Sequence, residues 1–418
     1  MSKPAHLVRR NVAARVRRAL EHTPVVLLNG ARQTGKSTLA QELIREGYKA
    51  DYVTLDDAGR RAAALDDPDG FIASFSRSAV IDEVQRAPGL FPAIKASVDR
   101  DRRPGRFLLT GSADVLLLPS ISESLAGRIQ IATLWPFSQG ELAGRLDTFV
   151  DGVFSERLPS ISEDRVLRSE VLHRALEGGF PEAIAHTDPE IRADWFDSYV
   201  DTILQREVRE LSRIEGLADL PRLLALLAGR AASILNAAEL ARASGFNYMT
   251  LRRYLALLEK VFFIHLIPSW SGSMARRLVR HPKLMLVDGG LLAHLLSIDL
   301  TRFERDPTLV GMVLENFVAL ELRKQLSWSR DVGKRLFHFR AHTGEEVDAV
   351  LERRGGEVVG VEVRATSAAR PADFRGLRAL AEATGKKFVR GVVLYTGRET
   401  IGFARNLHAV PISALWKL

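Results

Sequence analysis

The chain contains no cysteine among its 418 residues, which excludes disulfide bonds and thiolate metal sites. No apolar stretch approaches the roughly 20 residues that a membrane-spanning helix needs. The N-terminal residues 1–6 lack the apolar core of a secretion signal. These absences lead us to expect a cytoplasmic protein without a membrane partner.

Internal repeats and low-complexity tracts are also absent, and the composition is that of a globular protein, with 46% hydrophobic and 26% charged residues. A chain of this length predicts two or three domains. The formal net charge is +8. A basic balance favours polyanionic partners such as nucleic acid, although arginine-rich chains are also basic through genome composition.

A phosphate-binding loop follows the first apolar run. Residues 25–28 read as a buried strand, residues 30–37 have the pattern G-x-x-x-x-G-K-S, and an amphipathic helix pattern comes next. This strand–loop–helix context is typical of nucleoside triphosphatases, because glycines let backbone N–H groups turn toward phosphate oxygens. Lys36 would supply charge to the outer phosphates, and Ser37 a hydroxyl to Mg²⁺. The predicted nucleotide-binding residues are Gly30, Ala31, Arg32, Gln33, Thr34, Gly35, Lys36, Ser37 and Thr38.

Polar side chains end two further predicted strands. The apolar residues 78–81 lead into Asp82 and Glu83. In a parallel sheet these carboxylates would lie beside the phosphate loop, with Asp82 holding Mg²⁺ through water and Glu83 polarising the attacking water. Thr110 and Ser112 follow the next strand. Either hydroxyl could contact the γ-phosphate or the water, and the sequence leaves that choice open.

The chain is predicted to be an α/β protein of three parts. Residues 1–145 would form a P-loop ATPase domain with a parallel sheet, led by a basic amphipathic helix over residues 1–23. Residues 146–300 have a helical pattern, and residues 301–418 return to α/β. The strands expected in the first part lie at 25–28, 52–55, 79–81, 107–110 and 129–134.

At this point the chain resembles AAA+ ATPases, and more closely the prokaryotic AAA-family proteins that carry a conserved C-terminal domain of poorly known function. The resemblance covers nearly the whole chain. The matching stretches are 30–38, 81–85, 109–113, 124–128, 178–182, 253–259 and 282–284.

The resemblance implies that ATP hydrolysis, with Mg²⁺, drives or switches a conformational change. It makes Arg128 the candidate arginine for the γ-phosphate, a role often filled from a neighbouring subunit of a homo-oligomer. The expected target is DNA-related. One alternative is a protein partner, in a regulatory or toxin–antitoxin-like role, and a second is an ATP-regulated metal-dependent nuclease.

Residues 234–267 predict a winged-helix-like element. A helix over 237–243, a turn at 244–246, a helix over 247–260 and a strand over 262–267 follow one another. The second helix would direct Asn247, Thr250, Arg252 and Arg253 outward, where a recognition helix meets DNA. Such modules also serve as lids or protein-binding elements, and both alternatives stay open.

The last region is similar to the core of PD-(D/E)XK nucleases. In that family two or three carboxylates bind magnesium, and a lysine two residues after the last carboxylate assists the water. The corresponding residues here are Glu315 on a helix, Asp348 on a strand, and Glu362 with Arg364 on one face of the next strand. Arg364 replaces the lysine, and arginine cannot act as a base. We expect a degenerate nuclease fold that binds nucleic acid or stabilises an oligomer.

Overall fold

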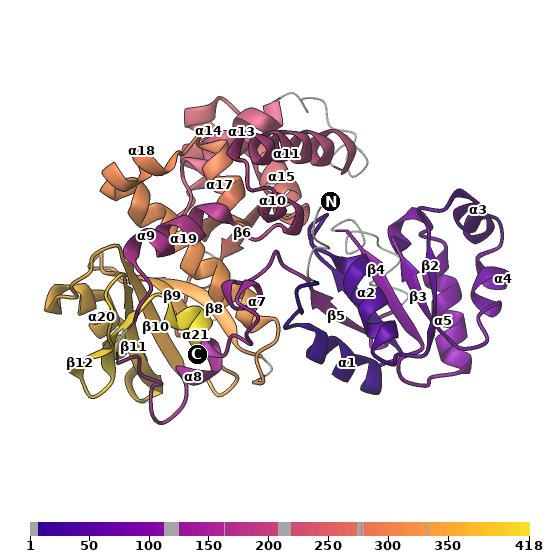
Figure 1. Cartoon of the computed structure of the whole chain (residues 1–418), viewed down its shortest axis with the longest axis horizontal. Coiled ribbons are helices and arrows are strands. Elements are labelled where there is room, and N and C mark those ends of the chain that lie inside the picture. The colour runs from indigo at the N-terminus through magenta and orange to yellow at the C-terminus, as the bar shows by residue number, and fades with distance from the viewer. Residues whose placement is uncertain are drawn as a thin grey trace.

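The computed structural model describes residues 7–112, 125–162, 164–207, 219–273, 277, 280–331 and 333–418. Ala113 and Ser124, at the ends of two stretches that carried the resemblance, lie outside them. The fold is mixed α/β, and Figure 1 shows the N-terminal sheet on the right, the helical middle region above and the C-terminal sheet at the lower left. No helix in the described ranges is long and apolar enough to cross a bilayer.

The N-terminal region is built on a five-stranded parallel sheet in the order β2-β3-β4-β1-β5. Each strand is a short run of mostly apolar residues, and the five residues of β1 are all buried. The strands are β1 (Val25–Asn29), β2 (Ala50–Thr54), β3 (Ser78–Asp82), β4 (Phe107–Gly111) and β5 (Ile129–Thr133). The helices are α1 (Ala13–His22), α2 (Lys36–Arg45), α3 (Ala58–Asp66), α4 (Pro68–Ala73), α5 (Leu90–Arg100) and the 3₁₀ turn η1 (Val84–Arg86).

The predicted N-terminal helix was too long. Helix α1 begins only at Ala13, and residues 7–10 have no regular structure. The reason is Arg10, whose buried guanidinium donates to the Thr34 and Trp135 carbonyls at 2.7 and 2.6 Å and to the Glu141 carboxylate at 3.2 Å. These long-range bonds hold the segment against the phosphate loop.

The middle region is mainly helical and includes the expected helix–turn–helix. Helix α14 (Ala237–Ser244) ends at Gly245, which has a left-handed φ of 78°, and α15 (Tyr248–Lys260) follows. A two-stranded antiparallel sheet, β6 (Ile264–Ile267) and β7 (Lys283–Leu286), comes next. The other helical elements are α7 (Gln139–Leu142), α8 (Phe149–Gly152), α9 (Arg168–Glu177), α10 (Pro181–Ala185), α11 (Pro189–Thr202), the π-helix η3 (Ile203–Glu207), α13 (Leu220–Ala228), α17 (Gly289–Leu295) and α18 (Leu300–Arg305).

Asn247 is exposed, as predicted, but its side-chain oxygen is already used within the protein. Its side chain caps helix α15 by accepting from the N–H groups of Met249 and Thr250 at 2.9 and 3.4 Å. Asparagine is favoured at this position because its oxygen satisfies otherwise unpaired N–H groups. Arg252 and Arg253 are exposed, as expected.

The C-terminal region is a six-stranded mixed sheet in the order β12-β13-β11-β10-β9-β8. Helix α19 (Pro307–Leu326) precedes it, and α20 (Arg375–Thr384) crosses between β10 and β11. The strands are β8 (Arg335–Arg340), β9 (Glu346–Glu352), β10 (Val358–Arg364), β11 (Phe388–Tyr395), β12 (Ile401–Ala404) and β13 (Leu407–Pro411); the short helices are η5 (Pro371–Phe374), η6 (Gly385–Lys387) and α21 (Ala414–Lys417).

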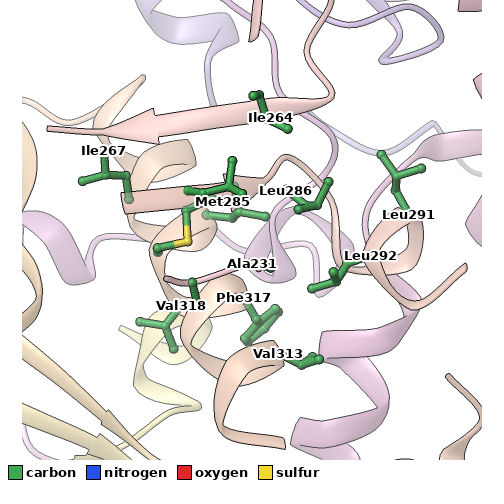
Figure 2. Packing of buried hydrophobic residues seen from close by; sticks show 14 of the residues in the cluster. Ala231, Ile264, Ile267, Met285, Leu286, Leu291, Leu292, Val313, Phe317 and Val318 are labelled. Atoms are coloured by element: carbon green, nitrogen blue, oxygen red, sulfur yellow. The ribbon is translucent and has the colours of Figure 1, made fainter. Parts of the chain in front are cut away.

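One hydrophobic core joins the middle and C-terminal regions. Figure 2 shows side chains of β6 and β7, such as Ile264 and Leu286, in one cluster with Val313 and Phe317 of α19. The same cluster of buried residues continues to Val361 in the C-terminal sheet. The N-terminal sheet instead buries most of its apolar side chains in two clusters of its own, one on each face. Helix α19 is therefore the shared wall between the second and third parts of the chain.

Candidate nucleotide site

The phosphate loop lies between β1 and α2, and two of its glycines are required there. A Cβ on Gly30 would lie 2.2 Å from the Leu134 carbonyl oxygen, so only glycine allows this approach. Gly35 caps α2 with a φ of 90°, a left-handed conformation that side chains disfavour. The loop therefore presents the N-terminus of α2 to the site, where unpaired N–H groups favour an anion.

Lys36 is buried inside this loop. Its Nζ donates to the carbonyls of Gly30 and Ala31 at 3.1 and 2.8 Å. Burial lowers the pKa of Lys36 to about 8, although the nearby Glu83 and Asp82 carboxylates act in the opposite direction. An anionic phosphate at this position would stabilise the charged ammonium.

Asp82 is the centre of a group of hydroxyls. Its carboxylate accepts from Ser37 Oγ at 3.0 Å, from Tyr52 Oη at 2.8 Å and from Thr110 Oγ1. Strand β3 lies between β2 and β4, so the sheet order places Tyr52 of β2 and Thr110 of β4 beside Asp82. The sequence predicted Ser37, Asp82 and Thr110 but missed Tyr52, because nothing in its local pattern marks it.

Glu83 begins the turn after β3 in a left-handed conformation, with φ of 57°. Its backbone N–H donates to Thr110 Oγ1 at 3.3 Å, and its carboxylate accepts from Gln85 Nε2. Gln85 Nε2 also donates to Ser112 Oγ at 3.1 Å. Thr110 thus contacts Asp82 and the Glu83 backbone, whereas Ser112 is joined to the Glu83 side chain through Gln85.

The loop opens into a cavity of about 440 Å³ that the middle region closes on its far side. Such a volume lies within the range of about 300–1,000 Å³ typical of ligand pockets. The loop side is lined by Arg32, Gln33, Gly35, Lys36, Ser37, Thr38 and Glu83, and the far side by Glu182, Trp195, Ser198, Tyr199, Thr202 and Ile203. The sequence did not predict the second group. The only signal for it was the stretch 178–182, which had identified the family.

That stretch is held firmly against the N-terminal region. The Phe137 N–H donates to the Gly179 carbonyl at 2.8 Å, and the Gly179 N–H donates to the buried Asp288 at 2.7 Å. A Cβ on Gly179 would lie 2.3 Å from the Phe137 carbonyl oxygen. The far wall therefore begins close to the segment that follows the N-terminal sheet.

Arg128 lies at the end of the parallel strands opposite to the end that carries the phosphate loop. It immediately precedes β5, which is parallel to β1, and its carbonyl accepts from the first residue of β1, Val25. A five-residue strand spans about 16 Å at roughly 3.3 Å per residue. The Nε of Arg128 donates to Asp99 at 2.6 Å on the surface. The structure does not bring Arg128 to the phosphate loop of its own chain.

The predicted C-terminal residues come together, with a lysine that the sequence did not place there. Lys283 of β7 reaches Glu315 and, at 3.1 Å, Asp348. Arg364 pairs with Glu362 at 2.6 Å and with Asp373 at 3.2 Å. We call Lys283, Glu315, Asp348, Glu362 and Arg364 the carboxylate cluster.

Electrostatics in the carboxylate cluster reflect its burial. Burial raises the pKa of Glu315 and of Glu362, and the neighbouring Asp348 raises both further. Burial alone would lower the pKa of Lys283, but Asp348 and Glu315 raise it overall. Among the residues that the structure describes, no group of three or more His, Cys, Asp or Glu side chains is arranged to hold a metal ion. Lys283 occupies the space between two of the carboxylates instead.

Comparisons with known proteins identify an AAA domain in the N-terminal region. Residues 22–143 match the family described as AAA domain, and residues 168–302 and 310–415 match two domains of unknown function (DUF8612 and DUF4143). The uncharacterized protein Rv2008c of Mycobacterium tuberculosis is 33% identical over 405 residues, which cover 96% of this chain and 83% of that protein. The chain belongs to the same family.

More distant relatives share less of the sequence. The uncharacterized protein MJ1544 of Methanocaldococcus jannaschii is 23% identical over 338 residues, covering 78% of this chain and 71% of that protein. Among solved structures, the Walker-type ATPase PABY2304 of Pyrococcus abyssi aligns with a TM-score of 0.44 and 15% identity, over 69% of this chain and 95% of that one. The match of residues 22–143 to the AAA domain is what supports ATP binding and hydrolysis by the N-terminal region.

Proposed function

We propose that this protein hydrolyses ATP at the loop 30–38 and uses the reaction to change the contact between its N-terminal and middle regions. The observation that carries the proposal is the convergence of Lys36, Ser37 and Glu83 on one cavity whose far wall belongs to the middle region. Binding groups from the loop and a carboxylate from a different strand thus face the same space.

Mg²⁺ fits the residues present, because Ser37 Oγ and the Asp82 carboxylate supply adjacent oxygens 3.0 Å apart, and magnesium prefers oxygen ligands. Ser37 and Asp82 would hold it, where it neutralises charge on the phosphates. Lys36 and the N–H groups at the start of α2 would bind and orient the triphosphate. Glu83 would accept a proton from the water that attacks the γ-phosphorus, as the bond to the leaving ADP oxygen breaks.

The far wall of the cavity would couple ATP hydrolysis to a movement of the middle region. A nucleotide in this cavity would touch α10 and α11 as well as the loop, so ATP and ADP would make different contacts across the boundary. A ligand shifts a conformational equilibrium only through such differential contacts. The exposed carboxylate of Glu182 lines the cavity. It would repel the more highly charged ATP more strongly than ADP, so the two nucleotides would interact differently with the far wall.

The target we propose is a nucleic acid that meets the helix–turn–helix. The start of α15 exposes Tyr248, Met249, Arg252 and Arg253, and Met249 is 68% exposed. Cationic and aromatic side chains at the N-terminus of such a helix suit phosphate and base contacts. A protein partner is the alternative for the same surface, and it would be favoured if salt-titrated DNA binding failed while ATPase activity persisted.

The test of hydrolysis is the Glu83→Gln variant. An amide cannot accept the proton, so turnover should fall on the order of 10²-fold or more while nucleotide binding is retained. ATP turnover and the Kd for a fluorescent ATP analogue should be measured with and without DNA. Glu21→Gln, an exposed glutamate of α1, is the matched control. Near-native hydrolysis in Glu83→Gln would refute the assignment of the base.

A further inference from the structure

Gln85 holds a position that the proposed mechanism does not yet use. It lies in the 3₁₀ turn η1, two residues after Glu83, and its side chain is half-buried. Its single amide nitrogen donates to Glu83 Oε2 and, at 3.1 Å, to Ser112 Oγ. One side chain therefore connects the carboxylate after β3 with the hydroxyl after β4.

The orientation of this amide is determined by Glu83. An ionised carboxylate only accepts hydrogen bonds, so Gln85 must present its nitrogen rather than its oxygen. The consequence is that Gln85 Oε1 is buried and has no hydrogen-bond partner among the described residues. Buried acceptors without a partner are rare, so this one needs an explanation. Here the amide leaves its own oxygen unpaired while it donates twice.

The Glu83 carboxylate depends on this contact for its position. The left-handed backbone at Glu83 projects the side chain toward the cavity, and Gln85 is the residue that donates to it in the described structure. A freely rotating carboxylate would spend little time aligned with the attacking water. Holding a catalytic group in the correct geometry makes the reaction much faster than when that group must first be oriented.

We propose that Gln85 is a positioning residue for ATP hydrolysis, which fixes the Glu83 carboxylate and ties it to Ser112. The inference rests on the proposed function, since it needs Glu83 to be the base. Gln85 does not itself exchange a proton. It acts through Glu83, and through the link to Ser112 it makes the alignment of the base depend on the end of β4.

The variant Gln85→Ala separates positioning from folding. We expect kcat to fall by roughly tenfold or more, with the Kd for a fluorescent ATP analogue within about twofold of native. A purely structural role would instead weaken nucleotide binding together with turnover. Arg86→Ala is the matched control in the same turn, since Arg86 pairs with Asp56 on the surface.

A double variant decides whether Gln85 acts through Glu83. Adding Gln85→Ala to Glu83→Gln should cause no further loss of turnover, because the base is already absent. A further loss, native turnover in Gln85→Ala, or an equal loss in Arg86→Ala would each overturn the inference. These outcomes are distinct from failure of the proposed function, in which Glu83→Gln alone keeps near-native turnover. Melting curves of all variants establish that they are folded.

Discussion

At the scale of single residues, the buried Lys36 makes nucleotide binding depend on pH. Its pKa is lowered to about 8 by burial, so the ammonium loses its proton as pH rises through that value. Bound phosphates favour the charged form, so binding should take up a proton above pH 8 and affinity should weaken there. Below about pH 7 the ammonium is already formed and affinity should be flat.

The measurement is the Kd of ATP from pH 6.5 to 9.5 at constant ionic strength, with calorimetry in two buffers to count protons. Lys36→Arg keeps its charge throughout and should abolish the pH dependence. Lys36→Ala should lose tight binding at every pH. A native Kd that is constant across pH 8 would contradict the role given to Lys36.

Local sequence patterns account for only part of the site. The loop residues and the Asp82–Glu83 pair could be predicted because each is contiguous and directly follows a buried strand. Tyr52, Gln85 and Lys283 could not, because each has a partner far away in the sequence, Asp82, Ser112 and Asp348 respectively, that only the tertiary fold brings close. Arg10 was read as part of a basic helix, yet it is buried against the loop.

At the scale of elements, α19 ties the regions together. Glu321 accepts from the Gln139 N–H at 2.9 Å, and Lys324 Nζ donates to the Phe137 carbonyl at 2.8 Å. Gln325 accepts from the Val150 N–H at 3.1 Å and donates to the Leu415 carbonyl at 2.7 Å. The sequence predicted a helix here from its apolar pattern. Its buried polar side chains gave no local signal, because the backbone groups that they bind lie between 90 and 187 residues away in the sequence.

Asp147, which lies near Glu321 of α19, makes the stability of the folded protein depend on pH. Burial and the nearby Glu321 raise its pKa to about 7, although the hydrogen bond from Ser138 acts against this. The folded state therefore binds more protons than the unfolded state between about pH 4 and pH 7, so the contribution of this group to stability is lost as pH rises through that window. The loss is on the order of a few kcal/mol.

The variant Asp147→Asn should remove that dependence. The native protein should lose thermal stability between pH 5.5 and pH 8, and Asp147→Asn should lose markedly less. Thermal melts at both pH values make the comparison, with Asp201→Asn, an exposed aspartate of α11, as the control. Equal slopes for native and Asp147→Asn would show that Asp147 is ionised in the folded state.

At the scale of the whole molecule, Arg128 can serve catalysis only across a boundary between chains. It lies at the end of the strands opposite its own loop, where it pairs with Asp99 on the surface. We predict that Arg128→Ala lowers kcat more than nucleotide affinity, because an arginine from a neighbouring copy would act on charge that develops in the transition state. Mixing Arg128→Ala with Lys36→Ala chains should restore part of the activity, since native loop and native arginine then meet in trans. No recovery, or unchanged turnover in Arg128→Ala, would make it a surface residue.

The carboxylate cluster connects the C-terminal sheet to the middle region. Lys283 comes from β7 of the middle region, whereas Asp348 and Glu362 belong to the C-terminal sheet, so the cluster fastens one region to the other. Its carboxylates are already neutralised in large part by Lys283 and Arg364. A buried charge left without its partner costs about 3–5 kcal/mol, so Lys283→Met should destabilise the fold strongly.

The same arrangement argues against cleavage of DNA. With Lys283 between Glu315 and Asp348, and Arg364 on Glu362, the carboxylates are committed to cations of the protein, and we expect no nicking of plasmid DNA with Mg²⁺ or Mn²⁺. Asp348→Ala and Glu362→Ala should leave ATP turnover per folded molecule largely unchanged, because the cluster is separate from the nucleotide cavity. Melting curves must accompany both assays, since either change removes a buried partner. Metal-dependent nicking that disappears in both variants while the fold is kept would establish an active nuclease and would make Lys283, rather than Arg364, the basic group beside the metal.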